Sequence, residues 1–301
     1  YIERPKHIEI QVMADAHGNV VSFGERECSM QRRYQKVIEE APSPAVNARR
    51  RSALSAAART ASAAVGYRSA GTVEFIMDEK RNFYFLEMNT RLQVEHPVTE
   101  MVYGVDLVKM QLEIAAGRPL AVRQKDVKPK GHAVEMRVYA EDPAHGFMPS
   151  VGRVRRLILP EGPGVRNDNG VYPGYEIPIH YDPMIGKLVV WAQTREEAIA
   201  RARRALREYR CDGVRTNADF LLWALTESTF VDGTYHTHTI EQRFDPTALH
   251  QREEAVELAS IAAVIAAFHH ATSVRFQSAP EAAADPWWQL ARHEGLRRFE
   301  R

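Results

Sequence analysis

Hydrophobic and polar residues alternate near the start of the chain, in the stretch His7-Ile8-Glu9-Ile10-Gln11-Val12-Met13. A period of two is the pattern of a half-buried β-strand. The turn-forming residues 15–19 follow, and with the apolar stretch 20–23 they predict a β-hairpin. Further strands are predicted at residues 71–77, 83–88 and 132–140.

Helical periodicity appears between and after these strands. Residues 48–65 are rich in Ala and Arg and are followed by Gly66, which favours a helix that ends at a glycine. Thr194 and Glu197 have the spacing of a capping box, and Asn217 is expected to cap a shorter helix. The predicted helices are 48–65, 106–116, 195–209, 218–227 and 253–270. Strands and helices mix without a regular βαβ alternation, so the predicted fold class is α+β.

Changes in composition divide the chain. A charged connector with a proline and a glycine spans residues 126–131, and the character changes again after Asp245-Pro246. We therefore predict one domain at 1–125, a second at 126–245, and a helical tail or linker at 246–301 that carries Trp287-Trp288. The chain opens at Tyr1 and enters a strand almost at once, which we interpret as a fragment or the ordered part of a longer chain.

Composition narrows the class of protein. Forty basic residues balance thirty-nine acidic ones, and a net charge of +1 gives no reason to expect nucleic acid or an acidic membrane as a partner. The only two cysteines, Cys28 and Cys211, are far apart, which argues against a disulfide scaffold and fits a reducing compartment. No run is apolar enough to cross a bilayer. We expect a cytoplasmic protein.

Functional groups concentrate in one short segment of the chain. If that segment is extended, alternate side chains project to the same side. Glu74, on the preceding predicted strand, would then face the start of the segment across a hairpin. The alternating polar residues are Glu87, Asn89, Arg91, Gln93 and Glu95.

These residue types suit a metal and a small anion. Two carboxylates with an amide oxygen are ligands for Mg²⁺, which often shares its oxygen ligands with substrate phosphates. Arg91 can bind a planar anion with two hydrogen bonds, and Glu95 can act as a base. The alternative is a solvated strand face with surface ion pairs.

Two other places carry clustered charge. Residues 31–36 include Gln31 and Lys36, and on spacing alone we favour a basic surface loop over a binding site. Arg137 lies in a predicted strand among apolar neighbours, where a structural ion pair and a functional role are equally compatible with the pattern. His236 and His238 have a spacing of two, but no third metal ligand accompanies them.

Several runs resemble the biotin carboxylase family, whose catalytic domain has the ATP-grasp fold. The likeness extends from Tyr1 to about Phe244. It implies the C-terminal half of an ATP-grasp domain, then a biotin carboxylase C-terminal domain and a helical tail. The runs are RPKHIEIQ at 4–11, ERECSMQRR at 25–33, EMNTR at 87–91, QVEHPVTE at 93–100 and YDPMIGKL at 181–188.

The resemblance implies roles that spacing alone leaves open. Glu95 matches the base that deprotonates bicarbonate, and Arg137 matches the residue that holds bicarbonate and stabilises the biotin enolate. The implied cofactors are ATP and Mg²⁺ or Mn²⁺, with biotin as a carrier-bound substrate. The metal is matched by Glu74, Glu87 and Asn89, the nucleotide by His7 and Gln31, and the bicarbonate pocket by Lys36, Arg91, Gln93 and Val94.

The implied reaction is MgATP-driven carboxylation of biotin by bicarbonate through carboxyphosphate, within an acetyl- or propionyl-CoA carboxylase. Its partners would be a biotin carboxyl carrier domain and a carboxyltransferase subunit in an oligomeric assembly. Other possibilities are a different ATP-grasp ligase and a non-catalytic assembly module.

The chain departs from the family pattern in three respects. Tyr34 stands where the family usually has His, and Pro163 replaces an aromatic residue of a bacterial dimer interface. The family's N-terminal domain and glycine-rich lid have no counterpart in this sequence, so we expect no turnover from these residues alone.

Overall fold

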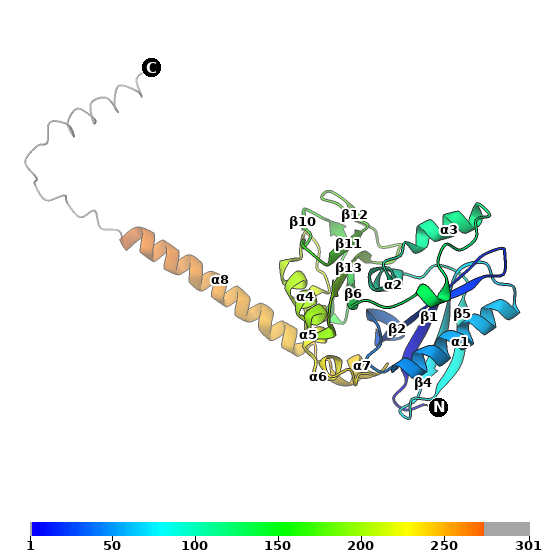
Figure 1. The fold of residues 1–301 in the computed structure, drawn as a ribbon. Helices are drawn as coiled ribbons and strands as arrows, with labels where there is room; N and C mark the ends of the chain where they lie inside the picture. Colours follow the sequence, from blue (N-terminus) through cyan, green and yellow to red (C-terminus); the bar gives the residue numbers. More distant parts are fainter. Residues whose placement is uncertain (1, 274–301) are drawn as a thin grey trace, which may run out of the picture. The chain divides into compact units, whose positions relative to one another are not determined.

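An eight-stranded antiparallel sheet forms the centre of the structure, a computed structural model that describes residues 2–273 (Figure 1). The strand order is β11-β13-β6-β3-β2-β1-β4-β5. The strands are β1 (Lys6–Ala14), β2 (Val20–Arg32), β3 (Gln35–Ala41), β4 (Ser69–Met77), β5 (Phe83–Asn89), β6 (His132–Tyr139), β11 (Val165–Asn169) and β13 (Met184–Ala192).

Shorter elements complete the described part. Pairs of short strands form three small ribbons: β7 (Glu141–Asp142) with β8 (Met148–Pro149), β9 (Gly152–Arg153) with β12 (Glu176–Ile177), and β10 (Arg156–Ile158) with β14 (Arg210–Asp212). The α-helices up to residue 243 are α1 (Ala48–Ala64), α2 (His96–Tyr103), α3 (Leu107–Ala115), α4 (Arg195–Glu208), α5 (Ala218–Thr226), α6 (Ser228–Val231) and α7 (Thr239–Arg243).

Alternation along β1 decides which side of the sheet carries polar groups. Ile8 and Ile10 pack with Leu54 of α1 in a buried apolar cluster. The intervening residues His7 and Glu9 therefore point to the opposite face. Burial of the apolar residues fixes the register, since a slip of one residue would exchange the two faces.

A larger core lies at the other end of the sheet. Val134 and Met136 of β6 pack with Ala198 and Ala202 of α4, and α5 covers the same cluster. The helix α4 begins with the predicted cap, because the Thr194 Oγ1 accepts a hydrogen bond from the Glu197 backbone N–H at 3.2 Å. Arg137 alternates with these apolar residues and so lies on the face opposite α4.

Most predicted elements are present, with three differences. The densely polar stretch 25–40 forms the greater part of β2 and β3 and is buried except around the hairpin tip, because its charged side chains pair with one another or with neighbouring strands. The helix α2 begins at His96 with Pro97 in its first turn, where a missing N–H costs nothing. Asn217 does not cap α5; its amide bonds the backbone of β6 instead.

The chain divides into two compact units, residues 1–249 and 250–301, of which the structure describes 2–249 and 250–273. The predicted segments on either side of residue 125 share one sheet, because β3 pairs with β6. Their division into two domains stays a prediction. The predicted tail corresponds in part to α8 (Thr247–Ser273), while Trp287-Trp288 lies outside the described residues. Among the helices described between residues 2 and 273, none has the length and apolarity needed to cross a membrane.

Candidate active site

A cavity of about 760 Å³ opens on the polar face of the sheet. It contains every site residue predicted from the sequence, although these come from five separate segments. The lining residues are Ile2, Pro5, His7, Gln31, Tyr34, Gln35, Lys36, Glu74, Ile76, Leu86, Glu87, Asn89, Arg91, Gln93, Val94, Glu95, Arg137, Thr237 and His238.

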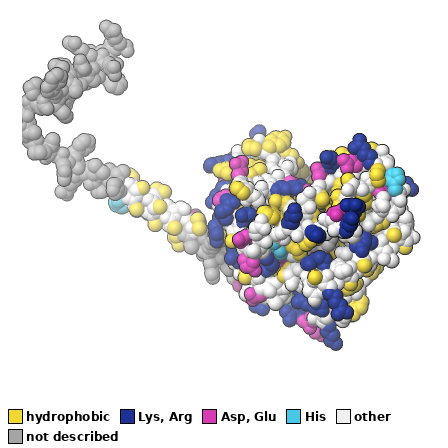
Figure 2. Space-filling model, viewed as in Figure 1, with side chains coloured by type: hydrophobic (Ala, Val, Ile, Leu, Met, Phe, Trp, Pro, Cys, Tyr) yellow, Lys and Arg dark blue, Asp and Glu magenta, His cyan; other side chains and the backbone are white. Residues whose placement is uncertain are grey.

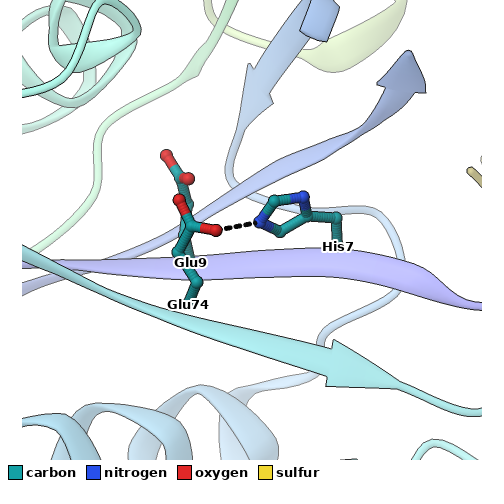
Figure 3. Close-up of side chains that lie close together, drawn as sticks. All are labelled: His7, Glu9 and Glu74. Atoms are coloured by element: carbon teal, nitrogen blue, oxygen red, sulfur yellow. Dashed lines mark hydrogen bonds and ion pairs between the residues drawn. The ribbon is translucent and has the colours of Figure 1, made fainter. Parts of the chain in front are cut away.

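A row of carboxylates crosses the sheet at this cavity, and two of them, Glu74 and Glu87, line it. Glu9 of β1 pairs in register with Glu74 of β4, which pairs in turn with Glu87 of β5. Figure 3 shows Glu9 and Glu74 side by side, with His7 close to both. The His7 Nε2 lies 2.8 Å from a Glu74 carboxylate oxygen. The predicted contact of Glu74 with Glu87 across the hairpin is thus confirmed at the level of strand register.

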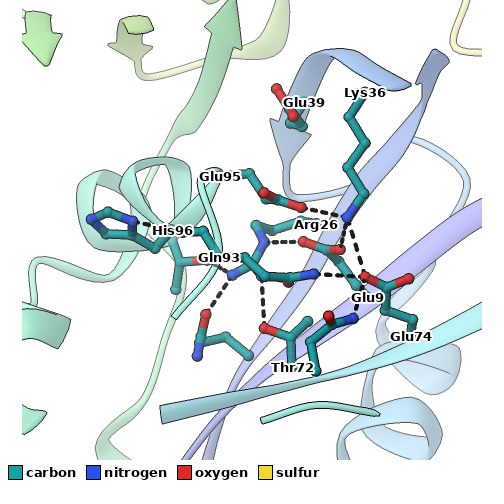
Figure 4. Close-up of polar contacts among 12 residues, drawn as sticks. Glu9, Arg26, Lys36, Glu39, Thr72, Glu74, Gln93, Glu95 and His96 are labelled. Atoms are coloured by element: carbon teal, nitrogen blue, oxygen red, sulfur yellow. Dashed lines mark hydrogen bonds and ion pairs between the residues drawn. The ribbon is translucent and has the colours of Figure 1, made fainter. Parts of the chain in front are cut away.

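Lys36 is the cation at the centre of the cluster (Figure 4). Its Nζ donates to Glu9 at 2.6 Å, to Glu74 at 3.2 Å, and to Glu95. Burial alone would lower the pKa of Lys36, but the surrounding carboxylates, Glu9 foremost, raise it. Lys36 is therefore a charged ammonium at neutral pH. Buried pairing of this kind explains why a stretch that reads as a basic surface loop lies inside the site.

Arg26 lies beneath the cluster, fully buried. Its guanidinium bonds Glu9 through Nε. It also donates to the side-chain oxygens of Gln11 at 2.7 Å and Gln93 at 3.1 Å, and to those of Thr72 and Thr99. Burial would raise the pKa of Glu9, but Arg26 and then Lys36 lower it to about 2. Arg26 thereby ties together β1, β2, β4 and the segment after β5.

Glu9 and Arg26 belong to the buried polar cluster next to the cavity, and the sequence reasoning missed both. The alternating pattern did indicate Glu9, because it follows His7 by two residues and therefore lies on the same face of the strand. The burial of Arg26 could not be predicted from the pattern, because polar and apolar residues do not alternate regularly in the polar stretch around it. The apolar lining residues Ile2, Ile76 and Leu86 were also not predicted as part of the site.

Glu95 is held between two cations. One of its oxygens accepts from Lys36 and the other from the Arg137 Nη2 at 2.9 Å. Arg137 also donates through Nε to Glu39 at 2.6 Å. Arg137 therefore forms a structural ion pair with Glu39 and also lines the cavity. The ion pair and the place in the candidate site, which the sequence offered as alternatives, thus belong to the same side chain.

The segment from Glu87 to Glu95 is only partly extended. The strand β5 ends at Asn89, and the chain then turns into α2. The five alternating polar residues still line one cavity. Arg91 is exposed, and its Nη1 donates only to the neighbouring Leu92 carbonyl at 3.3 Å within the described residues. The Val94 carbonyl accepts from Lys187 at 3.0 Å, which fixes the turn before Glu95.

The oxygen groups of Glu74, Glu87 and Asn89 fit a divalent cation. The Asn89 side-chain nitrogen lies 3.1 Å from an oxygen of each glutamate. Amide nitrogen and oxygen positions are interchangeable assignments, so this side chain can equally present its oxygen to a cation. Glu74 is buried and Glu87 is exposed, which gives a site that opens to the cavity. An all-oxygen set of this kind suits Mg²⁺ or Mn²⁺.

Three further residues, Gln31, Tyr34 and His238, line the cavity. Tyr34 is 89% exposed at the tip of the β2–β3 hairpin, where its φ of 66° is in the left-handed region. His238 lines the cavity, and the His236 Nδ1 accepts from its backbone N–H at 3.3 Å. Burial lowers the pKa of His236 to about 4. Gln31 donates to the Cys28 carbonyl at 3.0 Å.

Two family models match this chain. Residues 1–123 match the model for the carbamoyl-phosphate synthase L chain ATP-binding domain, and residues 135–242 match that for the biotin carboxylase C-terminal domain. The propionyl-CoA carboxylase alpha chain of Ruegeria pomeroyi is 47% identical over 91% of this chain and 43% of the relative. Biotin carboxylase 1 of Bacillus subtilis is 51% identical over 80% of this chain and 54% of the relative.

Solved structures are similar as well. The biotin carboxylase domain of 2-oxoglutarate carboxylase from Hydrogenobacter thermophilus, a dimer in complex with MgADP and bicarbonate, matches with a TM-score of 0.79 and 48% identity. That match covers 80% of this chain and 53% of the solved one. The biotin carboxylase subunit of a pyruvate carboxylase also matches with a TM-score of 0.79. This chain thus spans about half the length of the relatives it matches.

Proposed function

The chain belongs to the biotin carboxylase family, and we propose that it supplies the metal- and bicarbonate-binding half of an ATP-dependent biotin carboxylase. The observation that carries this proposal is the position of Glu95. Its carboxylate lies between Lys36 and Arg137 in a cavity that also holds the carboxylates suited to a metal.

The floor of the cavity is the proposed site of metal and nucleotide. Glu74, Glu87 and Asn89 would hold Mg²⁺, which when bound neutralises phosphate charge during phosphoryl transfer. The apolar side chains of Ile2, Ile76 and Leu86 offer a surface for the nucleotide base, and His7 and Gln31 lie nearby as polar contacts. The cavity supports this proposal, because its lining includes both carboxylates and apolar side chains.

Bicarbonate is the proposed substrate of the cationic end. Arg91 is free to bind a planar anion with two hydrogen bonds, with Gln93, the Val94 segment and Lys36 around it. Glu95 would accept the bicarbonate proton, and the deprotonated oxygen would attack the γ-phosphorus of ATP to give carboxyphosphate and ADP. Lys36 and Arg137 would offset the negative charge that gathers on these groups.

Arg137 has a second proposed task. After carboxyphosphate breaks down to CO₂ and phosphate, biotin would lose its N1 proton to the released phosphate and attack CO₂. The enolate oxygen that forms would be stabilised by the Arg137 guanidinium, as in an oxyanion hole. Glu39 and Glu95 hold that guanidinium by Nε and Nη2, and Arg137 also hydrogen-bonds the Tyr139 side chain.

We also propose that the complete protein is the alpha chain of an acyl-CoA carboxylase, with a biotin carboxyl carrier domain and a carboxyltransferase as partners. The support is the match to the propionyl-CoA carboxylase alpha chain, which is 47% identical over 91% of this chain.

The test is whether ATP hydrolysis by the complete protein depends on bicarbonate and rises with free biotin. We expect both dependences. Hydrolysis that needs bicarbonate but ignores biotin would instead support a different ATP-grasp ligase, the second candidate, which the match to a carbamoyl-phosphate synthase model favours.

A further inference from the structure

Two buried glutamates lie side by side behind Arg137. Glu39 of β3 and Glu135 of β6 are direct partners in the antiparallel pairing of these strands, and both are 0% exposed. Directly opposite side chains on one face of such a pair have Cβ atoms about 4.5–5.5 Å apart. The proposed reaction assigns no step to either residue.

The two carboxyl groups have unequal partners. One oxygen of Glu39 accepts from Arg137 at 2.6 Å. The other oxygen of Glu39 and both oxygens of Glu135 have no hydrogen-bond partner among the residues that the structure describes. Arg137 also donates to Glu95 at 2.9 Å. A single guanidinium thus serves Glu39 and Glu95, and Glu135 receives no hydrogen bond from it.

Two other cations lie near Glu39 and Glu135, but both bond other groups. Lys187 of β13 is the cross-strand neighbour of Arg137, but its Nζ bonds the Val94 carbonyl at 3.0 Å and lies 3.4 Å from Asp168. Lys36 of β3 bonds Glu9, Glu74 and Glu95. An unpaired carboxylate in a buried site is strongly disfavoured and takes up a proton instead.

We propose that Glu39 and Glu135 hold one proton between them and act together as positioning residues for Arg137. Ionised Glu39 anchors the guanidinium, while Glu135 remains a neutral acid whose proton keeps the pair at a single negative charge. The role of Arg137 in this inference rests on the proposed function. The protonation of the pair does not.

The electrostatics of the sheet agree with this geometry. Burial raises the pKa of Glu39 to about 7, although the charge of Arg137 opposes the change. Burial, and then the charge of Glu39, raise the pKa of Glu135 well above its ordinary value. Two interacting carboxyl groups titrate as a pair. Because Arg137 bonds Glu39, the first proton leaves Glu39 and the second stays on Glu135.

Arg137 is also fixed at its backbone. The Asn217 side chain donates to the Arg137 carbonyl at 3.0 Å and accepts from the Tyr139 N–H at 2.9 Å. The two hydrogen bonds of Asn217 fix the backbone from which the Arg137 side chain extends. Glu39 holds the guanidinium at the other end of that side chain. Loss of Glu39 would therefore remove one anchor of the guanidinium, which Glu95 still contacts, without unfolding the strand.

Infrared spectroscopy of the complete protein at neutral pH tests the shared proton directly. We expect a carbonyl band of a protonated, buried carboxylic acid that disappears in Glu135→Gln. The matched control is Glu40→Gln, next to Glu39 on β3 and as buried as Glu135, because His132 and Arg195 lower the pKa of Glu40 to about 2 against the effect of burial. If Glu135→Gln removes no such band, the pair is fully ionised and the proposal is overturned.

Kinetics tests the positioning role. Glu39→Gln keeps an oxygen that can accept from Arg137 but loses the charge, and Glu39→Ala loses both. We expect kcat for biotin-dependent ATP cleavage to fall about tenfold in the first variant and further in the second, with the KM for MgATP unchanged. Wild-type kcat and bicarbonate KM in both variants would overturn positioning. A wild-type protein without biotin-dependent cleavage would refute the proposed function, while the infrared result would still decide the pair.

Discussion

Replacement of Arg26 by Met removes the cation beneath the site while roughly keeping the side-chain volume. Arg26 is fully buried, and its guanidinium bonds Glu9, Gln11 and Gln93 besides two threonines. Removal of one partner from a buried ion pair typically costs about 3–5 kcal/mol, because the remaining charge stays buried without compensation. We expect a loss of that size in the free energy of unfolding.

The assay is urea unfolding followed by circular dichroism, with Arg204→Met as the matched control. Arg204 is exposed on α4 and pairs with Glu208 one turn further on, a contact worth about 0.3–0.5 kcal/mol. Arg26→Lys keeps the charge but not the planar set of donors. Its loss in free energy of unfolding should therefore lie between those of Arg204→Met and Arg26→Met. If Arg26→Met costs no more than Arg204→Met, Arg26 does not hold the strands together as described.

Four further outcomes follow from the same contacts. Glu95→Gln should lower bicarbonate-dependent ATP cleavage by the complete protein about 10²-fold or more, with nucleotide binding by calorimetry retained. Arg137→Ala should abolish biotin-dependent turnover while nucleotide binding stays intact, and normal carboxylation would refute its role. Glu9 and Glu40 have folded-state pKa values lowered to about 2, so their contribution to stability is complete above about pH 5 and lost as the pH falls towards 2; acid titration by circular dichroism should show this loss, and a stability that is flat over this range would contradict it. Tyr34→His should change the KM for ATP more than that for bicarbonate, since Tyr34 lies at the cavity mouth; the reverse would place it at the bicarbonate end.

Periodicity predicted the elements whose faces differ sharply in polarity. The alternation in β1 and the apolar stripe of α4 follow directly from a requirement to bury one face. The polar part of β2 that follows the predicted stretch 20–23, and the strand β3, could not be predicted in this way, because their burial depends on partners such as Arg26 with Glu9 that are adjacent only after folding. The proline at the start of α2 likewise concealed a helix that begins there.

The site was partly predictable for a related reason. Glu74 and Glu87 lie on consecutive strands joined by a tight turn, so local pattern was enough to bring them together. Lys36 and Arg137 reach the same cavity from strands far apart in sequence, and their charge alone was equally compatible with a surface position or a structural pair. Family resemblance, and not spacing, pointed to them as site residues.

Transfer of radiolabelled bicarbonate to biotin by the complete protein tests the central claim most directly. The account predicts label in biotin that requires both ATP and a divalent cation, and its loss in Glu95→Gln. ATP cleavage without label in biotin, or undiminished labelling by Glu95→Gln, would contradict it.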